Sequence, residues 1–135
     1  MGLKKVILFA LVIMSIGTAL ELYLLDHYED KLQLIPILCI GLVIVTVILL
    51  IYLRSKVMKG LFKFILVITA LSGFYGSYLH LIANYEFEQE MKPTASTMHL
   101  LSESLSGALP ALAPFSMVVL ALIGYSYLII INQNK

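Results

Sequence analysis

The chain has 135 residues, of which 61% are hydrophobic and only 13% are charged. A soluble domain carries about 25% charged residues, so a chain this small and apolar cannot bury its hydrophobic surface in one soluble core, and lipid is the expected solvent. The formal net charge is +1, and the single cysteine, Cys39, excludes an internal disulfide and a cysteine-ligated metal site.

Four apolar runs of membrane-spanning length follow one another along the chain, at residues 6–25, 32–53, 61–83 and 108–131. A helix needs about 20 apolar residues to cross a hydrocarbon core of about 30 Å. The first run is too long for a signal-peptide core of about 7–15 residues, so we interpret it as an uncleaved helix. Short connections at 26–31 and 55–60 make consecutive helices antiparallel neighbours. The sequence predicts one all-α domain over residues 1–135, a four-helix transmembrane bundle with up-down-up-down order.

Charge is divided between the two sides of this predicted bundle. One side holds seven of the nine basic residues: Lys4, Lys5, Arg54, Lys56, Lys59, Lys63 and Lys135. The other side holds all eight acids, the three histidines, Lys31 and Lys92, so it carries 2 − 8 = −6 against +7. The positive-inside rule predicts that both termini are cytoplasmic and that the acidic side is external. We expect an integral membrane protein, and the topology accounts for the basic residues without a patch for nucleic acid.

The external segment, residues 84–107, is predicted to contain a short interfacial helix. Pro93 breaks the chain after an acidic run, and residues 96–105 then form a helical pattern with Gly107 in the favoured C′ position. Pro110 suits the first turn of the fourth span. Pro114 lies four residues deeper, where it is either tolerated as part of the helix start or frees a backbone carbonyl or kinks the helix.

The third span has a small, polar face and a large, amphipathic face. The small face comprises Thr69, Gly73, Gly76, Ser77, His80, Ala83, Asn84 and Glu88. The large face comprises Leu71, Tyr75, Tyr78 and Ile82. We expect the small face to pack closely on another helix and the large face to contact lipid. A matching stripe in the first span comprises Ala10, Met14, Gly17, Thr18 and Glu21.

Glu21 and His80 are predicted to lie at similar depth and to meet inside the bundle. An isolated carboxylate in a span costs about 2.5–3.5 kcal/mol at the bilayer centre, so Glu21 should face a partner. Three interpretations stay open: a structural clamp between two helices, a divalent-cation site, and a path for proton or cation movement. A haem with two axial histidines is disfavoured, because only His80 lies clearly inside a span.

The candidate metal ligands are Glu21, His80, Asn84 and Glu88, with His99 and Glu103 as weaker candidates that fold over from the external helix. Carboxylate and imidazole groups suit transition metals such as Zn, Mn, Cu(II) or Fe. The spacing lacks a dense metal-binding motif, so the pattern is compatible with a divalent metal ion without specifying it.

The second half of the chain resembles an uncharacterised family of small bacterial four-span membrane proteins. The resemblance rests on the stretch GSYLHLIANYEFEQE (Gly76–Glu90), followed by Pro93 and by the P-A-L-A-P segment from Pro110 with Met117. The family motif has the form H-x-x-x-N-x-E-x-E-x-E followed by P-A-L-A-P-x-x-M, and the external segment departs from the family in lacking Trp. The resemblance implies a shared fold and supplies no activity.

The leading functional prediction is a non-enzymatic membrane protein with an outward-facing His/Glu/Asn site that binds a divalent cation. The alternative is an accessory or assembly subunit of a larger membrane complex, in which the His/Glu pair is a structural clamp and the acidic face docks a basic partner. An enzyme is disfavoured, since the sequence offers no nucleophile–base set and no glycine-rich phosphate loop. Besides the lipid bilayer, the expected partners are copies of the same chain or other subunits of a complex.

Overall fold

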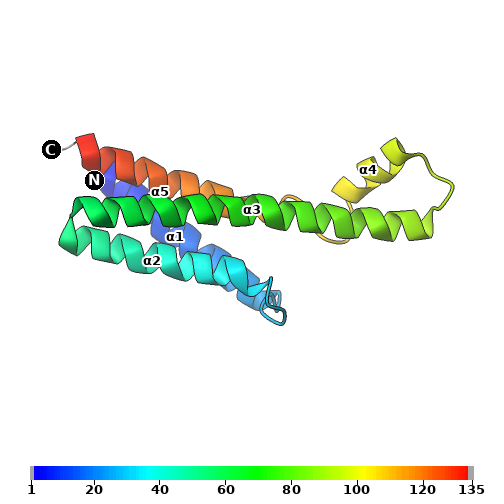
Figure 1. Ribbon diagram of the computed structural model, residues 1–135, viewed down its shortest axis with the longest axis horizontal. Helices are drawn as coiled ribbons and strands as arrows, with labels where there is room; N and C mark the ends of the chain where they lie inside the picture. Colours follow the sequence, from blue (N-terminus) through cyan, green and yellow to red (C-terminus); the bar gives the residue numbers. More distant parts are fainter. Residues whose placement is uncertain (1, 134–135) are drawn as a thin grey trace.

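The computed structural model describes residues 2–133, and within them it shows five helices and no strand. The helices are α1 (Leu3–Leu24), α2 (Leu34–Leu53), α3 (Lys56–Met91), α4 (Thr97–Leu105) and α5 (Phe115–Gln133). All except α4 are long and apolar enough to cross a membrane, as expected of a multi-pass membrane protein. Both ends of the described chain lie beside the α2–α3 connection (Figure 1). We call this the terminal end; Lys135 lies outside the described residues.

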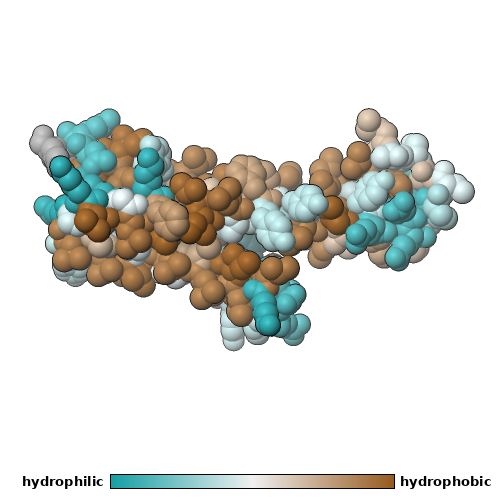
Figure 2. All heavy atoms as spheres, viewed as in Figure 1, coloured by the Kyte–Doolittle hydropathy of each residue, from teal (hydrophilic) through white to brown (hydrophobic). Residues whose placement is uncertain are grey.

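The four long helices pack around a core of apolar side chains. Helix α3 packs against α2 and α5, and α1 packs against α5 and α2. Val43, Phe62 and Leu120 are fully buried where these helices meet. Apolar side chains also cover the outside of the bundle, while hydrophilic residues gather toward its ends (Figure 2). This distribution suits a bundle that is surrounded by lipid.

Small residues let α3 and the start of α5 approach closely. A Cβ atom on Gly73 would lie 2.8 Å from the Pro114 carbonyl oxygen, and one on Gly76 would lie 2.9 Å from Pro114 Cβ. Such distances are too short for any residue larger than glycine without a shift of the helices. On the opposite face, Leu71 and Tyr78 are exposed. The two predicted faces of the third span are therefore confirmed.

Helix α3 is longer than the predicted third span, which was expected to end at residue 83. It begins at the N-cap Ser55, whose hydroxyl accepts a hydrogen bond from the Met58 amide at 3.1 Å. It ends at Met91, because the residue before Pro93 is disfavoured in a helix and Lys92 leaves the helical region with φ −132°. At 1.5 Å per residue, α3 is about 54 Å long. Its last turns therefore extend beyond the other helices (Figure 1).

The extension of α3 carries α4 and the link to α5, and we call residues 81–114 the distal hairpin. Helix α4 packs back against α3 (Figure 1). It is capped by Ser96, whose hydroxyl accepts from the His99 amide. Leu100 and Ser104 of α4 are buried against the rest of the hairpin. The short helix predicted at residues 96–105 is confirmed, with its first residue at Thr97.

Helix α5 begins at Phe115, later than the predicted start of the fourth span at residue 108. The preceding segment forms turns with hydrogen bonds between residues three apart: the Ala113 amide donates to the Pro110 oxygen and the Met117 amide to the Pro114 oxygen, both at 3.0 Å. Pro114 has no N–H to donate to the carbonyl four residues earlier, so a regular α-helix does not form across Pro110–Pro114. That carbonyl, on Pro110, accepts from Ala113 instead, and its second lone pair stays available for another donor.

Candidate functional site

Glu21 does not meet His80. The buried residues of α1 are Leu11, Ser15 and Thr18. At about 100° per residue, Glu21 lies roughly 90° from the centre of this face, and its side chain is exposed. Within residues 2–133, the Glu21 carboxylate forms no hydrogen bond or ion pair. The expectation that Glu21 faces the bundle is therefore wrong. The predicted stripe of the first span is also wrong at Gly17, which is exposed, but Thr18 is buried and Met14 packs against the core.

His80 instead lies next to Pro110 and the connection between α1 and α2. Its Nδ1 atom is 3.1 Å from the Pro110 carbonyl oxygen, the carbonyl that Pro114 leaves without an α-helical partner. In neutral His80, Nδ1–H donates to this oxygen, so Nε2 keeps its lone pair. The ring centroids of His27 and His80 are 6.4 Å apart, with the rings inclined at 70°. The histidine pair therefore joins the α1–α2 connection to α3 and to the segment that precedes α5.

The position of His27 is set by the way α1 ends. Asp26 has a left-handed conformation with φ 51°. Its amide donates to the Tyr23 oxygen at 3.1 Å, and the His27 amide donates to the Leu22 oxygen at 2.9 Å, which is the bond pair of a Schellman motif. The Tyr28 hydroxyl donates to Asp26 at 2.8 Å. Partial burial lowers the pKa of His27, and the nearby charge of His80 lowers it further.

Asn84 holds the distal hairpin together. Its Nδ2 atom donates to the carbonyl oxygens of Ser104 at 2.8 Å and Leu109 at 2.7 Å, while its Oδ1 atom accepts from the Leu109 amide at 3.0 Å. The side chain is buried, with 3% exposure. Both amide hydrogens and one oxygen lone pair are thus used by the backbone. This structural role was missed at the sequence level, where Asn84 was assigned only as a candidate metal ligand.

Gly107 makes room for the Asn84 side chain. A Cβ atom on Gly107 would lie 2.5 Å from Asn84 Cγ, a distance that no larger residue could tolerate. Gly107 follows the C-cap Ser106, as predicted, but it does not have a positive φ. The glycine is therefore required for close approach and not for the left-handed turn that the sequence suggested.

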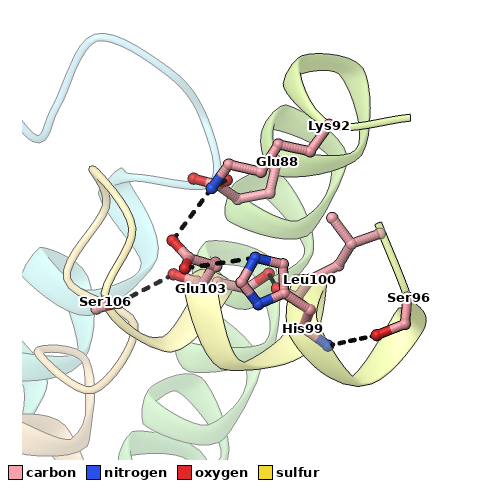
Figure 3. A network of polar contacts seen from close by, with 8 residues as sticks. Glu88, Lys92, Ser96, His99, Leu100, Glu103 and Ser106 are labelled. Atoms are coloured by element: carbon pink, nitrogen blue, oxygen red, sulfur yellow. Dashed lines mark hydrogen bonds and ion pairs between the residues drawn. The ribbon is translucent and has the colours of Figure 1, made fainter. Parts of the chain in front are cut away.

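Glu88 and Glu103 lie together, with a lysine between them (Figure 3). Lys92 Nζ is 3.0 Å from Glu88 Oε2 and 3.3 Å from Glu103 Oε2. Hydrogen bonds to Glu88 and then to Glu103 raise the pKa of Lys92. His99 Nε2 is 3.8 Å from Glu103 Oε1. The ammonium group occupies the place that a cation shared by the two carboxylates would take.

The candidate ligands are thus distributed over separate places. Glu21 stands alone on α1, His80 pairs with His27, Asn84 binds backbone groups, and Glu88 joins the lysine-bridged network on the distal hairpin. In the described part of the chain, no three His, Cys, Asp or Glu side chains are grouped so that they could hold a metal ion. A metal role for these residues stays a prediction, and the arrangement itself is that of a braced helical hairpin.

Comparison of the chain with protein-family models, with curated proteins and with solved structures gives no match. The resemblance noted above therefore stays an interpretation of the motif, and function has to be argued from geometry.

Proposed function

We propose that this protein is a non-enzymatic accessory subunit of a larger complex in the bacterial inner membrane, and that its distal hairpin docks another protein on the external side. The observation that carries this proposal is the triple hydrogen bond of Asn84, which holds α4 on α3 in one orientation. A preorganised element costs less conformational entropy on binding than a mobile loop. Both termini would then be cytoplasmic, as the basic residues of the terminal end predict.

The hairpin presents an apolar face away from its own core. Met98, Leu101 and Leu105 recur at i, i+3 and i+7 along α4 and are 76%, 41% and 60% exposed. This spacing puts them on one side of the helix, while Leu100 and Ser104 are buried against the hairpin. In Figure 2, apolar atoms continue from the bundle onto the hairpin. A contiguous exposed apolar patch on an ordered element is typical of an interaction site.

The charge of the hairpin indicates the chemistry of the partner. Residues 84–107 contain four glutamates and one lysine, a net charge of 1 − 4 = −3. Glu88 and Glu103 are bridged by Lys92. Glu86 and Glu90 are exposed and form no ion pair with any residue in the described range. A protein surface with an apolar centre and a rim of Lys and Arg would complement this face.

Site-specific crosslinking tests the docking proposal. A photoreactive amino acid replaces Leu101 on the exposed face of α4 or, as a control, Leu71 on the lipid-facing side of α3, which is 61% exposed. In native membranes, position 101 should give a discrete protein adduct and position 71 only lipid adducts. Asn84→Ala should abolish the adduct from position 101, because it releases α4. Lipid adducts alone at both positions would refute the proposal.

Cation binding is a second candidate function, favoured by the His27–His80 pair. The Pro110 carbonyl fixes the Nδ1 side of His80, an arrangement common behind metal-binding histidines. A metal ion about 2.0–2.1 Å from a nitrogen of each ring would hold the ring centroids roughly 5 Å apart. The centroids are 6.4 Å apart in the structure, so metal binding would require the rings to approach and each to turn a nitrogen toward the same ion.

Calorimetric titration with Cu(II) tests this second function, since Cu(II) is the divalent ion that imidazole sites bind most tightly. His27→Ala and His80→Ala should each weaken binding at least tenfold. His99→Ala is the matched control, since it removes a histidine from α4 outside the pair. Equal losses from all three substitutions, or no binding by the unmodified protein, would exclude the site.

A further inference from the structure

A cavity opens at the terminal end, where the ends of all four long helices converge. Its volume is about 220 Å³, and its lining includes Lys4 from α1, Leu50 from α2, Lys59 from α3 and Tyr127 from α5. Arg54, the residue that follows α2, also lines it. Pockets that enclose a whole drug-sized ligand measure about 300–1,000 Å³. A cavity of the present size suits a headgroup-sized fragment whose remainder lies outside the protein.

Three cationic side chains line this cavity, and no Asp or Glu side chain of the described residues is near them. Every acidic residue of the chain lies in residues 21–30 or 86–103, toward the opposite ends of the helices. The ion pairs found within residues 2–133 all belong to the distal hairpin. Lys59 Nζ donates to the Asn132 side-chain oxygen at 2.6 Å, and Arg54 Nε donates to the Ile51 carbonyl at 3.4 Å. These are neutral acceptors, so no charged group within residues 2–133 compensates the positive charge of Lys4, Arg54 and Lys59.

The floor of the cavity is apolar, in contrast to its cationic rim. Leu50 and Tyr127 are each only 2% exposed, and Ile131 is half-buried beside them. The cavity lies at the ends of the membrane-spanning helices, the depth at which phosphate groups give way to acyl chains. A ligand with a phosphate and an attached apolar part would match both the rim and the floor.

The backbone places Arg54 at the mouth of the cavity. Arg54 has a left-handed conformation with φ 46°, and its amide donates to the Leu50 carbonyl at 3.2 Å. An arginine guanidinium can donate two parallel hydrogen bonds to a phosphate, whereas lysines act as point charges. The cavity therefore combines one planar donor with two ammonium groups, a set suited to a phosphate.

We propose that Lys4, Arg54 and Lys59 form a binding site for a phosphate group, supplied by an anionic phospholipid of the surrounding leaflet. Basic pockets between the ends of membrane-spanning helices recognise anionic headgroups in this way. The proposal does not depend on the docking function of the distal hairpin, which lies at the other end of α3. The other source of the same chemistry would be a soluble phosphate compound.

Native mass spectrometry of the detergent-purified protein tests the proposal. The protein is titrated with dioleoyl phosphatidylglycerol or with dioleoyl phosphatidylcholine, which has the same chains and no net charge. Phosphatidylglycerol should bind at least tenfold more tightly. Arg54→Gln and Lys59→Gln should each weaken its binding about fivefold, the expected effect of one cation near an anionic headgroup. Lys59→Arg, which keeps the positive charge, should bind phosphatidylglycerol like the unmodified protein.

Two matched controls separate a site from diffuse attraction. Lys56→Gln removes a charge from the same first turn of α3 as Lys59, and Lys5→Gln removes the charge next to Lys4 in α1, but neither residue lines the cavity. These controls should bind phosphatidylglycerol like the unmodified protein, whereas Lys4→Gln should bind it more weakly. Equal losses in controls and cavity variants, or equal binding of the two lipids, would overturn the proposal.

A parallel titration with inorganic phosphate distinguishes the two sources. Millimolar phosphate should leave lipid binding unchanged if the apolar floor contributes to affinity. Displacement of phosphatidylglycerol by millimolar phosphate, lost in Arg54→Gln, would overturn the assignment to a lipid and give the site to a soluble phosphate compound. All variants should retain the melting temperature of the unmodified protein, because the substituted side chains lie at the solvent-facing end.

Discussion

Replacing Asn84 with alanine should release the distal hairpin while leaving the bundle folded. The substitution removes three hydrogen bonds to the backbone of Ser104 and Leu109. Each hydrogen bond contributes about 0.5–1.5 kcal/mol net, a total of about 1.5–4.5 kcal/mol. Alanine favours the helix by up to about 0.7 kcal/mol, but this gain acts on α3 and not on the attachment of α4. We therefore expect the hairpin to lose about 2–3 kcal/mol of local stability.

Hydrogen–deuterium exchange in nanodiscs measures this loss directly. Local opening made easier by about 2–3 kcal/mol should accelerate exchange in peptides from residues 97–109 roughly 30- to 150-fold. Peptides from α5 should exchange as before, because α5 packs on α3 where Met117 and Val118 approach Gly73, outside the distal hairpin.

The matched control is Gln89→Ala, which truncates an exposed amide side chain on the same helix. It should leave exchange in α4 within about twofold of the unmodified protein, the range expected for a surface substitution. Unchanged exchange of residues 97–109 in Asn84→Ala would show that α4 is held by apolar contacts alone, and the reasoning from hydrogen bonds would fail.

Two further predictions concern packing and pH. Gly73→Ala should lower the melting temperature in detergent, because its Cβ would lie 2.8 Å from the Pro114 carbonyl oxygen. Gly41→Ala is the control: a Cβ there has no atom within 4 Å, so the substitution should stabilise the helix by about 0.5–1 kcal/mol. The same shift of melting temperature in both variants would contradict the close α3–α5 contact. The pKa of His27 is lowered in the folded state, so folding favours the neutral imidazole. This contribution to stability is fully present above pH 6.5, the ordinary pKa of histidine, and is lost as the pH falls from 6.5 toward the folded-state pKa. On acidification, hydrogen exchange of residues 22–33 should therefore accelerate in the unmodified protein relative to His27→Gln measured at the same pH. His99→Gln should behave like the unmodified protein. A pH response that persists in His27→Gln would assign the response to another group.

Helical periodicity predicted the two faces of α3 but put Gly17 and Glu21 of α1 on the wrong face. The composition of the two helices explains the difference. In α3, small residues such as Thr69 and Gly73 recur on one face while Leu71 and Tyr78 recur on the other, so the pattern has a direction. In α1 nearly every position is apolar, so a helical wheel does not distinguish a packed face centred on Gly17 and Glu21 from one centred on Leu11. The structure buries Leu11, Ser15 and Thr18 and leaves Glu21 exposed.

The contacts that build the distal hairpin could not be predicted, because they join distant residues. Asn84 bonds to groups 20 and 25 residues away. Its spacing from His80 and Glu88 is equally compatible with a metal ligand and with a backbone clamp. The position of Gly107 after α4 was predictable, but its contact with Asn84 was not, since the contact depends on how α4 folds back.

The basic cavity could not be predicted from the sequence either. Lys4, Arg54 and Lys59 come from three helix ends, and the positive-inside rule places them on one side without showing which basic residues converge. By contrast, one of the two predicted effects of Pro114 is observed, because the loss of an N–H at a fixed spacing is a local property. The carbonyl that it frees on Pro110 is the one that His80 approaches.

The uninterrupted length of α3 joins the two ends of the bundle through one continuous helix. Lys59, at the basic cavity, and Asn84, at the root of the hairpin, belong to one helix without a proline between them. They are separated by 25 residues, or about 38 Å along the axis. If such a rod tilts by about 10° around its midpoint, each end moves sideways by roughly 3 Å. Under the proposed docking function, a displacement of the hairpin would thus change the mouth of the cavity at the terminal end without any rearrangement within the helix.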